Sequence, residues 1–295
     1  MSPVPAPEAA SAADRLFARL LAMLPQHALS RCVHRAARWP WRPWKSVLIG
    51  AFRRLYAVDL GEAAEPDPAA YPSFNAFFTR ALRPGVRPQP ATADAVTSPV
   101  DGRLSAHGRL EGEQLMQAKG QHYTLTALLG GDPGLAAGLR DGAYATLYLS
   151  PRDYHRVHMP CAGRLRRMLH VPGRLFGVSP PLVRAVPELF ARNERVVCLF
   201  DGARGPFAVV LVGAIGVGSI ETVWAGEITP PAAKTLRTWD YGDRGPALAR
   251  GEELGRFNLG STVILAFGPG QVRWNAGLRP EAPVRLGETL ARISH

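Results

Sequence analysis

Apolar residues recur every three or four positions along the first sixty residues, with arginines set between them. The resulting helical patterns cover about residues 14–24, 29–38, 45–56 and 74–80. Pro25 ends the first pattern, and a tryptophan- and proline-rich run from Trp39 to Trp44 separates the second from the third. The sequence therefore predicts three amphipathic N-terminal helices, followed by a fourth that is short.

Beyond residue 80 the pattern changes to short apolar runs separated by glycine and proline, which is typical of strands. The uncharged run 205–220 is broken by glycines and is too short for a membrane-spanning helix, so it also predicts strands. Glycine–acid–leucine turns at 251–255 and 286–291 are similar to those of lipoyl- and biotinyl-like domains. We expect an α+β fold, with a β-rich core of lipoyl/biotinyl-like sandwich character preceded by the amphipathic helices.

Positive charge is concentrated in the N-terminal helices. The chain has a net charge of +11, and residues 1–60 hold nine basic and three acidic residues, a balance of +6. Basic amphipathic helices with flanking tryptophans are typical of a membrane interface, where arginine meets anionic lipid. The alternative is that these helices cover the protein's own core. No nucleic-acid-binding signature accompanies the charge, so no nucleic acid partner is expected.

The cysteines indicate a reducing compartment. Cys32, Cys161 and Cys198 are odd in number and form no CxxC pair, so neither a disulfide framework nor a zinc site is predicted. The N-terminus is rich in alanine and proline and does not resemble a signal peptide. We expect a cytosolic protein without a membrane-spanning segment.

Gly260-Ser261 is the stretch best suited to chemistry. Glycine tolerates strained backbone angles and leaves its carbonyl open to attack. The Ser261 hydroxyl is close enough along the chain to attack the Gly260 carbonyl, and an apolar strand pattern follows from Thr262. The alternative is an ordinary turn that leads into a strand.

Two histidines and one aspartate are further candidates. His155 and His158 are three residues apart, so on a strand they face opposite sides. A metal site would require a third ligand at a recognisable spacing, and we predict no metal. Asp101, in a turn between Pro99 and Gly102, could orient a histidine base for Ser261, although spacing alone cannot join these three residues.

Seven motifs carry a family resemblance. They are Phe77-Phe78-Thr79-Arg80, Ser98-Pro99-Val100-Asp101-Gly102, Gln117-Ala118-Lys119-Gly120, the stretch Ser150–Pro160, Phe190-Ala191-Arg192-Asn193-Glu194-Arg195, Val217–Val223 and Leu259-Gly260-Ser261-Thr262. In this order they resemble the phosphatidylserine decarboxylase proenzymes of bacteria. The Leu-Gly-Ser-Thr form and the basic N-terminus are similar to the membrane-associated branch of that family.

The resemblance implies self-cleavage between Gly260 and Ser261. His158, oriented by Asp101, would take the proton of Ser261, and the alkoxide would attack the Gly260 carbonyl to form an ester. Elimination of the ester and loss of ammonia would leave a covalent pyruvoyl group as the cofactor. The implied products are a large chain 1–260 and a small chain 261–295.

The resemblance also implies the second reaction. The pyruvoyl ketone would form a Schiff base with phosphatidylserine, accept the electrons released with CO2 and yield phosphatidylethanolamine. His155 is the candidate for positioning the carboxylate or transferring the proton, with a structural strand histidine as the alternative. Phe176 and Ser179 are candidates for substrate binding, although Gly177 departs from the serine that the family often has there.

These expectations divide the chain into three parts. Residues 1–60 would dock on the anionic cytoplasmic face of the cell membrane as a peripheral region, 61–260 would form the β-rich catalytic core, and 261–295 would complete it. A homodimer is compatible with the sequence, and removal of residues 1–55 is expected to leave cleavage intact. The alternatives are a serine hydrolase that uses Asp101, His158 and Ser261, a non-catalytic lipoyl-like module tethered to a membrane, and a pyruvoyl decarboxylase of soluble amino acids.

Overall fold

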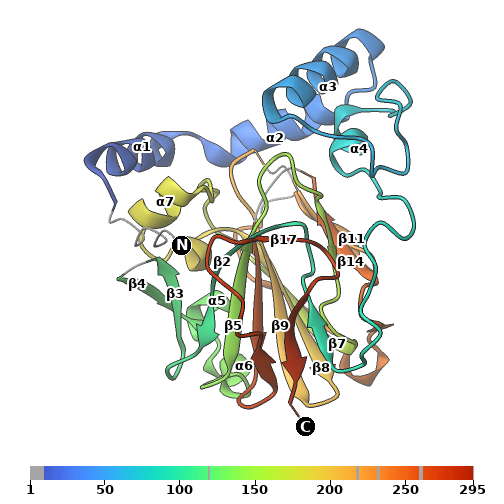
Figure 1. The fold of residues 1–295 in the computed structure, drawn as a ribbon. Coiled ribbons are helices and arrows are strands. Elements are labelled where there is room, and N and C mark those ends of the chain that lie inside the picture. Colours follow the sequence, from blue (N-terminus) through green and yellow to red (C-terminus); the bar gives the residue numbers. More distant parts are fainter. Residues whose placement is uncertain (1–9, 119, 217–218, 231–232, 259–261, 295) are drawn as a thin grey trace, which may run out of the picture.

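The N-terminal helices lie across one end of a β-rich body in the computed structural model (Figure 1). The structure describes residues 10–118, 120–216, 219–230, 233–258 and 262–294. Gly260 and Ser261 therefore lie outside the described residues. The C-terminal strand ends at the far end of the body from the helices (Figure 1).

The four predicted helices are confirmed, with small shifts at their ends. They are α1 (Ala12–Met23), α2 (Gln26–Arg38), α3 (Arg42–Tyr56) and α4 (Phe74–Phe78). The α1 helix begins with a capping box between Ser11 and Asp14. The α3 helix starts earlier than expected because Pro43 stands in its first turn, where a helix tolerates proline.

A nine-stranded antiparallel sheet dominates the described part of the body. Its strands, in spatial order, are β12 (Arg237–Asp240), β7 (Gly163–Val171), β8 (Arg195–Gly202), β9 (Gly205–Val212), β15 (Thr262–Phe267), β5 (Ala143–Tyr148), β2 (Gly102–Arg109) and β17 (Pro283–Val284), with β13 (Ala247–Leu248) also paired to β7. The strand predicted after Ser261 is thus β15, at the centre of the sheet.

Smaller sheets and short helices complete the body. The sheets are β1 (Ala95–Thr97), β18 (Thr289–Ile293) and β16 (Val272–Trp274); β11 (Gly226–Thr229), β10 (Ile220–Thr222), β14 (Glu253–Phe257) and β6 (Arg156–His158); and β3 (Gln114–Ala118) with β4 (Gln121–Thr124). The helices are α5 (Leu125–Leu128), α6 (Pro133–Ala137), α7 (Pro180–Ala185), α8 (Leu189–Arg192) and the 3₁₀ turn η1 (Gly242–Arg244). The mixed, β-rich class is confirmed, and the lipoyl/biotinyl-like sandwich stays a prediction.

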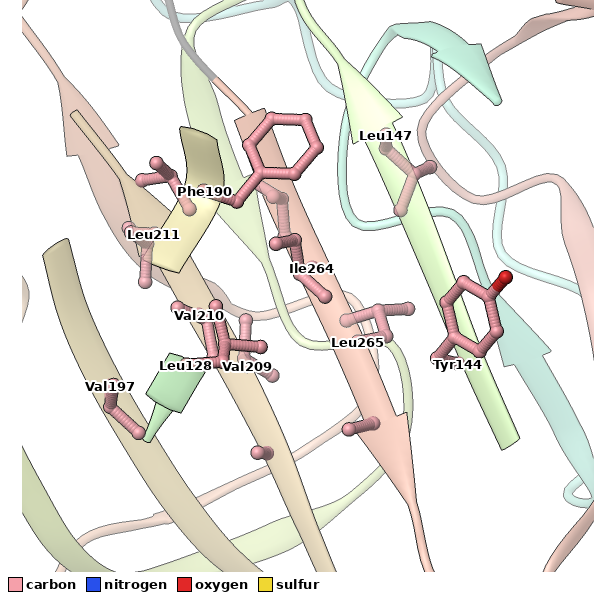
Figure 2. Packing of buried hydrophobic residues seen from close by; sticks show 14 of the residues in the cluster. Leu128, Tyr144, Leu147, Phe190, Val197, Val209, Val210, Leu211, Ile264 and Leu265 are labelled. Atoms are coloured by element: carbon pink, nitrogen blue, oxygen red, sulfur yellow. The ribbon is translucent and has the colours of Figure 1, made fainter. Parts of the chain in front are cut away.

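The main core surrounds β15, whose residues are all buried. In the register of the sheet, Val263 lies between Leu211 of β9 and Leu147 of β5. Figure 2 shows Ile264 and Leu265 packed among side chains of these two neighbouring strands. Because both faces of the central strands are covered, they consist of almost continuous apolar residues.

A second hydrophobic cluster lies under the N-terminal helices. It joins α2, α3, α4 and the segment between them, and its buried members are Ala37, Ile49, Val58, Leu60, Ala63, Tyr71, Phe74, Phe77 and Phe78. Phe52 of α3 packs edge-on against all three phenylalanines of α4. The α4 helix is thereby held between α3 and the body.

Candidate active site

The start of β15 defines the place where the candidate residues meet. Thr262 lies between Tyr148 of β5 and Val212 of β9, so the residue after Ser261 is fixed in the sheet. A cavity of about 290 Å³ opens beside Tyr148. It is lined by Phe52, Tyr56, Phe78, Tyr148, Leu149, Pro151, Gly177, Val178, Ser179, Ala214, Ile215 and Gly216. This mostly apolar cavity lies next to the strand that Ser261 precedes.

His155 is fully buried next to this cavity. Its ring centroid lies 4.1 Å from that of Phe78, and its Nδ1 lies 2.8 Å from the Asp153 carbonyl oxygen. Because a carbonyl only accepts, Nδ1 carries the proton and Nε2 has a free lone pair. Nε2 has no hydrogen-bond partner among the described residues. Burial, with a smaller contribution from the Arg80 cation, lowers the pKa of His155 to about 3, so the imidazole is neutral.

His158, at the end of β6, lies in different surroundings. Its Nδ1 lies 2.8 Å from the Gly251 carbonyl oxygen, and its Nε2 lies 3.1 Å from the Tyr154 hydroxyl. This arrangement places the proton on Nδ1, so Nε2 accepts from Tyr154 and is the basic nitrogen. Burial lowers the pKa of His158, which keeps it neutral and able to accept a proton.

Asp101 is held by groups that the sequence did not single out. Arg87 donates to both carboxylate oxygens, at 2.9 Å from Nε and 2.6 Å from Nη2, and the Leu286 N–H donates at 2.8 Å. The hydrogen bond to Asp101 raises the pKa of Arg87. Asp101 is close enough to favour the charged form of His158. The fold thus brings the two residues near each other, and the orienting role of Asp101 stays a prediction.

Arg80 adds a buried cation close to these groups. The residue is only 6% exposed, its Nη2 donates to the Arg152 carbonyl oxygen at 3.3 Å, and its Nη1 has no partner among the described residues. Burial lowers the pKa of Arg80. The side chain lines a polar cavity of about 330 Å³ together with Asp101 and Tyr154. Arg80 is the last residue of the Phe77-Phe78-Thr79-Arg80 motif. Its charge within that motif is the sequence feature that could have marked it as a site residue.

Sequence comparison identifies the family. A family model described as phosphatidylserine decarboxylase matches residues 74–292, and a second, described as PSD, matches residues 16–57. The chain belongs to the phosphatidylserine decarboxylase family. It is 60% identical to a phosphatidylserine decarboxylase proenzyme of Alkalilimnicola ehrlichii over 86% of this chain and 89% of the relative. It is 54% identical to the proenzyme of Methylococcus capsulatus over 94% and 96% of the two chains.

Of the two candidate substrate-binding residues, Ser179 lines the apolar cavity and Phe176 is not among the residues that line it. Ser179 lines the apolar cavity, as do Gly177 and Val178. Phe176 is buried, and its ring is flanked by the guanidinium groups of Arg174 and Arg192. The roles of Phe176 and Ser179 in binding stay predictions.

The unusual glycine of this decarboxylase is matched to its surroundings. A Cβ atom at Gly177 would lie 2.7 Å from Cδ1 of Leu182, which is closer than side chains approach one another. A serine at this position would therefore require Leu182 to move. The departure from the family pattern is thus accompanied by a leucine that fills the space.

Within the described residues, no group of three or more His, Cys, Asp or Glu side chains is arranged to hold a metal ion. None of the helices in the described part of this decarboxylase has both the length and the apolar character needed to cross a membrane.

Proposed function

We propose that this chain is a phosphatidylserine decarboxylase proenzyme that cleaves itself between Gly260 and Ser261. The proposal rests on the identity of 60% to a relative named as such a proenzyme, over 86% of the chain. The products would be a large chain 1–260 and a small chain 261–295. β15 of the small chain would remain bound, because it is paired on both sides with strands of the large chain.

Self-cleavage would use His158 as the base. Nε2 of His158 accepts the proton from Ser261 Oγ, which then attacks the Gly260 carbonyl carbon. The peptide C–N bond breaks, an ester forms, and the amine of residue 261 receives the proton. Loss of the α-proton and of the Gly260 carboxylate, followed by addition of water and release of ammonia, leaves the pyruvoyl group. The Nε2 lone pair, which accepts from Tyr154 among the described residues, is the acceptor that the first step requires.

The residues around the start of β15 fit a pyruvoyl group at position 261. When formed, this group supplies a carbonyl that condenses with an amine and accepts the electrons released with CO2. The neutral His155 offers a free Nε2 lone pair, which can accept a hydrogen bond from the substrate's ammonium group. The apolar lining of the cavity excludes water and disfavours the substrate carboxylate relative to neutral CO2. His155 is therefore proposed to orient the substrate amine in the second reaction.

The N-terminal helices are proposed to dock on the cytoplasmic face of the cell membrane. Leu16, Phe17 and Leu20 of α1 are 59%, 47% and 52% exposed, and Arg15 and Arg19 are exposed beside them. An apolar helix face flanked by arginines suits the boundary between anionic headgroups and acyl chains. A diacyl substrate resides in such a boundary, so docking would place the cavity near its source.

The orientation of α2 supports the same proposal. Its polar residues Gln26 and Ser30 are buried against the body, whereas Leu29 is 42% exposed. Gln26 accepts from the Leu175 N–H at 2.9 Å, and Ser30 accepts from the Gly216 N–H at 3.2 Å. A helix in water would bury its leucine and expose its polar residues. In α2 the exposed residues instead combine Leu29 with Arg31 and Arg35, a mixture that suits the boundary between acyl chains and anionic headgroups.

The test is the intact mass of the purified chain, compared with Ser261→Ala and His158→Ala. We expect two fragments that meet at 260/261, with the small one blocked by a pyruvoyl group, and uncleaved chains from both variants. The matured protein should convert phosphatidylserine in mixed micelles to phosphatidylethanolamine. An uncleaved wild-type chain of 31.9 kDa after incubation with phospholipid would contradict the proposal and favour the hydrolase or the binding module.

A further inference from the structure

A closed ring of hydrogen bonds joins helix α2 to the residue that precedes the cleavage segment. Arg38 donates from Nη1 to both Glu227 carboxylate oxygens at 2.9 Å and from Nε to the Asn75 side-chain oxygen at 3.3 Å. Asn75 Nδ2 donates to the backbone oxygen of Asn258 at 3.0 Å. Asn258 Nδ2 donates to the Ser219 hydroxyl, which in turn bonds to Glu227. The ring thus spans α2, α4 and the sheet of β10, β11 and β14.

Asn258 is the most completely held member of this ring. It is 3% exposed, its N–H donates to the Ser219 carbonyl oxygen at 3.0 Å, and its side-chain oxygen accepts from Asn75 Nδ2 at 3.2 Å. Its backbone oxygen also accepts from Asn75. The backbone and side chain of Asn258 are therefore fixed together by two residues, Asn75 and Ser219.

The chain is also fixed on the other side of the cleavage segment. Thr262 is buried and paired on both sides within the nine-stranded sheet. The candidate bond Gly260–Ser261 lies between these two anchors, two residues after Asn258 and one before Thr262. Attack on a carbonyl requires an approach of about 3–3.5 Å along a defined direction, and an error of about 1 Å costs on the order of 100-fold in rate. Two fixed anchors are a means of restricting that approach.

We propose that Asn258 and the ring that holds it are positioning residues for self-cleavage, and that α2 takes part in processing through Arg38. The inference rests on the proposed function, because it assigns a role in the same cleavage reaction. It extends that function by coupling a helix of the proposed docking region to maturation. None of the ring residues needs to touch the reacting atoms.

The ring explains why this part of α2 is polar. Glu227 is an exposed acid that pairs with Arg38, and His34 Nε2 also lies 2.6 Å from its carboxylate. The pair therefore holds α2 against β11 while Arg38 Nε remains directed at Asn75.

The experiment measures the first-order rate of cleavage after a short cell-free synthesis pulse. The variants are Asn75→Leu, which removes the donor to Asn258 at similar size, and Asn75→Asp, which keeps the acceptor for Arg38 but loses the donor. Ser219→Ala and Arg38→Met test the other members. We expect cleavage to slow about 10- to 100-fold for the Asn75 and Ser219 variants and about 3- to 10-fold for Arg38→Met.

Asn275→Leu is the matched control. Asn275 also donates from Nδ2 to a backbone oxygen, that of Thr289 at 2.8 Å, but it lies outside the ring. This variant should cleave at the wild-type rate. The fraction that has matured in each variant should decarboxylate phosphatidylserine within about 3-fold of wild type per pyruvoyl group. Slower cleavage with nearly unchanged turnover per pyruvoyl group would distinguish a role in positioning for cleavage from a general loss of structure.

Two results would overturn the inference. The first is cleavage of Asn75→Leu and Ser219→Ala at the rate of Asn275→Leu. The second is a fall of the cleavage rate and of the turnover per pyruvoyl group by the same factor, together with lower melting temperatures of the variants in a Ser261→Ala background. That combination would indicate that the ring residues have only a structural role. If the wild-type chain does not cleave at all, the proposed function fails, and that outcome is distinct from equal cleavage of wild type and variants.

Discussion

The body and the N-terminal helices of this protein bury their apolar side chains to different extents. The cluster around β15 and β9 is buried within the body. Among the described residues, ten of the large exposed apolar side chains belong to residues 12–56 and three, Met116, Val223 and Leu236, to the rest of the chain. The described part of the body thus exposes few large apolar side chains, whereas the helical region presents many outwards. This difference is what the proposed docking of the helices on a membrane requires.

The two regions nevertheless meet at the candidate active site. Phe78, a member of the helical cluster, packs on His155 of the body. Asn75 bonds to Asn258, and the Arg156 side chain donates to the Thr79 carbonyl oxygen at 2.9 Å. The helical region is thus both an outward-facing surface and one wall of the site. Its removal is expected to affect more than membrane binding.

The largest expected effect comes from deleting residues 1–56. The deletion removes α3 from its packing with the three phenylalanines of α4, and the exposure of each costs about 1.5–3 kcal/mol. This sum is a large fraction of the 5–15 kcal/mol that stabilises a typical domain. The deletion also removes Arg38 from the ring. We expect cleavage to fall more than about 100-fold, as measured by the same pulse assay.

Deletion of residues 1–24 is the control for this result. It removes only α1, which packs on α7 through Ala18 and leaves the second cluster and the ring intact. This shorter deletion should cleave normally and lose affinity for vesicles. Normal cleavage after deletion of residues 1–56 would support the expectation drawn from sequence alone, in which the helices only dock, and would contradict the coupling that we infer.

A smaller effect is expected from the outward face of α1. Replacing Leu16, Phe17 and Leu20 by glutamine keeps the helix but removes apolar area that would enter the lipid, at about 1 kcal/mol for each side chain. Binding to vesicles that contain phosphatidylglycerol should weaken about 100-fold, as measured by co-sedimentation. Cleavage should be unchanged, because these side chains are exposed and none of them belongs to the ring.

The exposed apolar residues of the body provide the comparison. Met116→Gln, Val223→Gln and Leu236→Gln remove three apolar side chains of similar exposure. This triple variant should bind vesicles as the wild-type chain does. Equal weakening by the two sets of substitutions would show that lipid contact is not confined to the helices and would remove the contrast between the regions.

The sequence predicted where the helices and strands lie better than it predicted which side of each helix is buried. Periodicity identified α1 to α4 and the strand after Ser261, because these elements have regular apolar spacing. It could not show that α2 turns Gln26 and Ser30 toward the body, since polar spacing ordinarily marks the side that faces water.

The contacts within the site were beyond sequence patterns for another reason. Asn75 and Asn258 are 183 positions apart, and Asp101 is joined to Leu286 across 185 positions. No local spacing records such pairs, because they exist only once the sheets have formed. The histidines could be named from a family motif, but Tyr154 and Arg87, which bond to His158 and Asp101, required the fold.

The smallest expected effect concerns His155, where the two regions meet. Its pKa is about 3 in the folded chain, mainly because it is buried, and about 6.5 when unfolded. Between these values the unfolded chain binds a proton that the folded chain does not, so this group lowers stability as the pH falls below 6.5. From pH 7.0 to 5.5 the loss is on the order of 1 kcal/mol. The measurement is urea unfolding at both pH values of the Ser261→Ala chain, with and without His155→Gln. Comparing these two chains separates the contribution of His155 from those of His107 and His158, whose pKa values are also lowered by burial. The glutamine variant should lose on the order of 1 kcal/mol less over this interval. An identical pH dependence of the two chains would mean that His155 is open to water and that α4 does not seal the site.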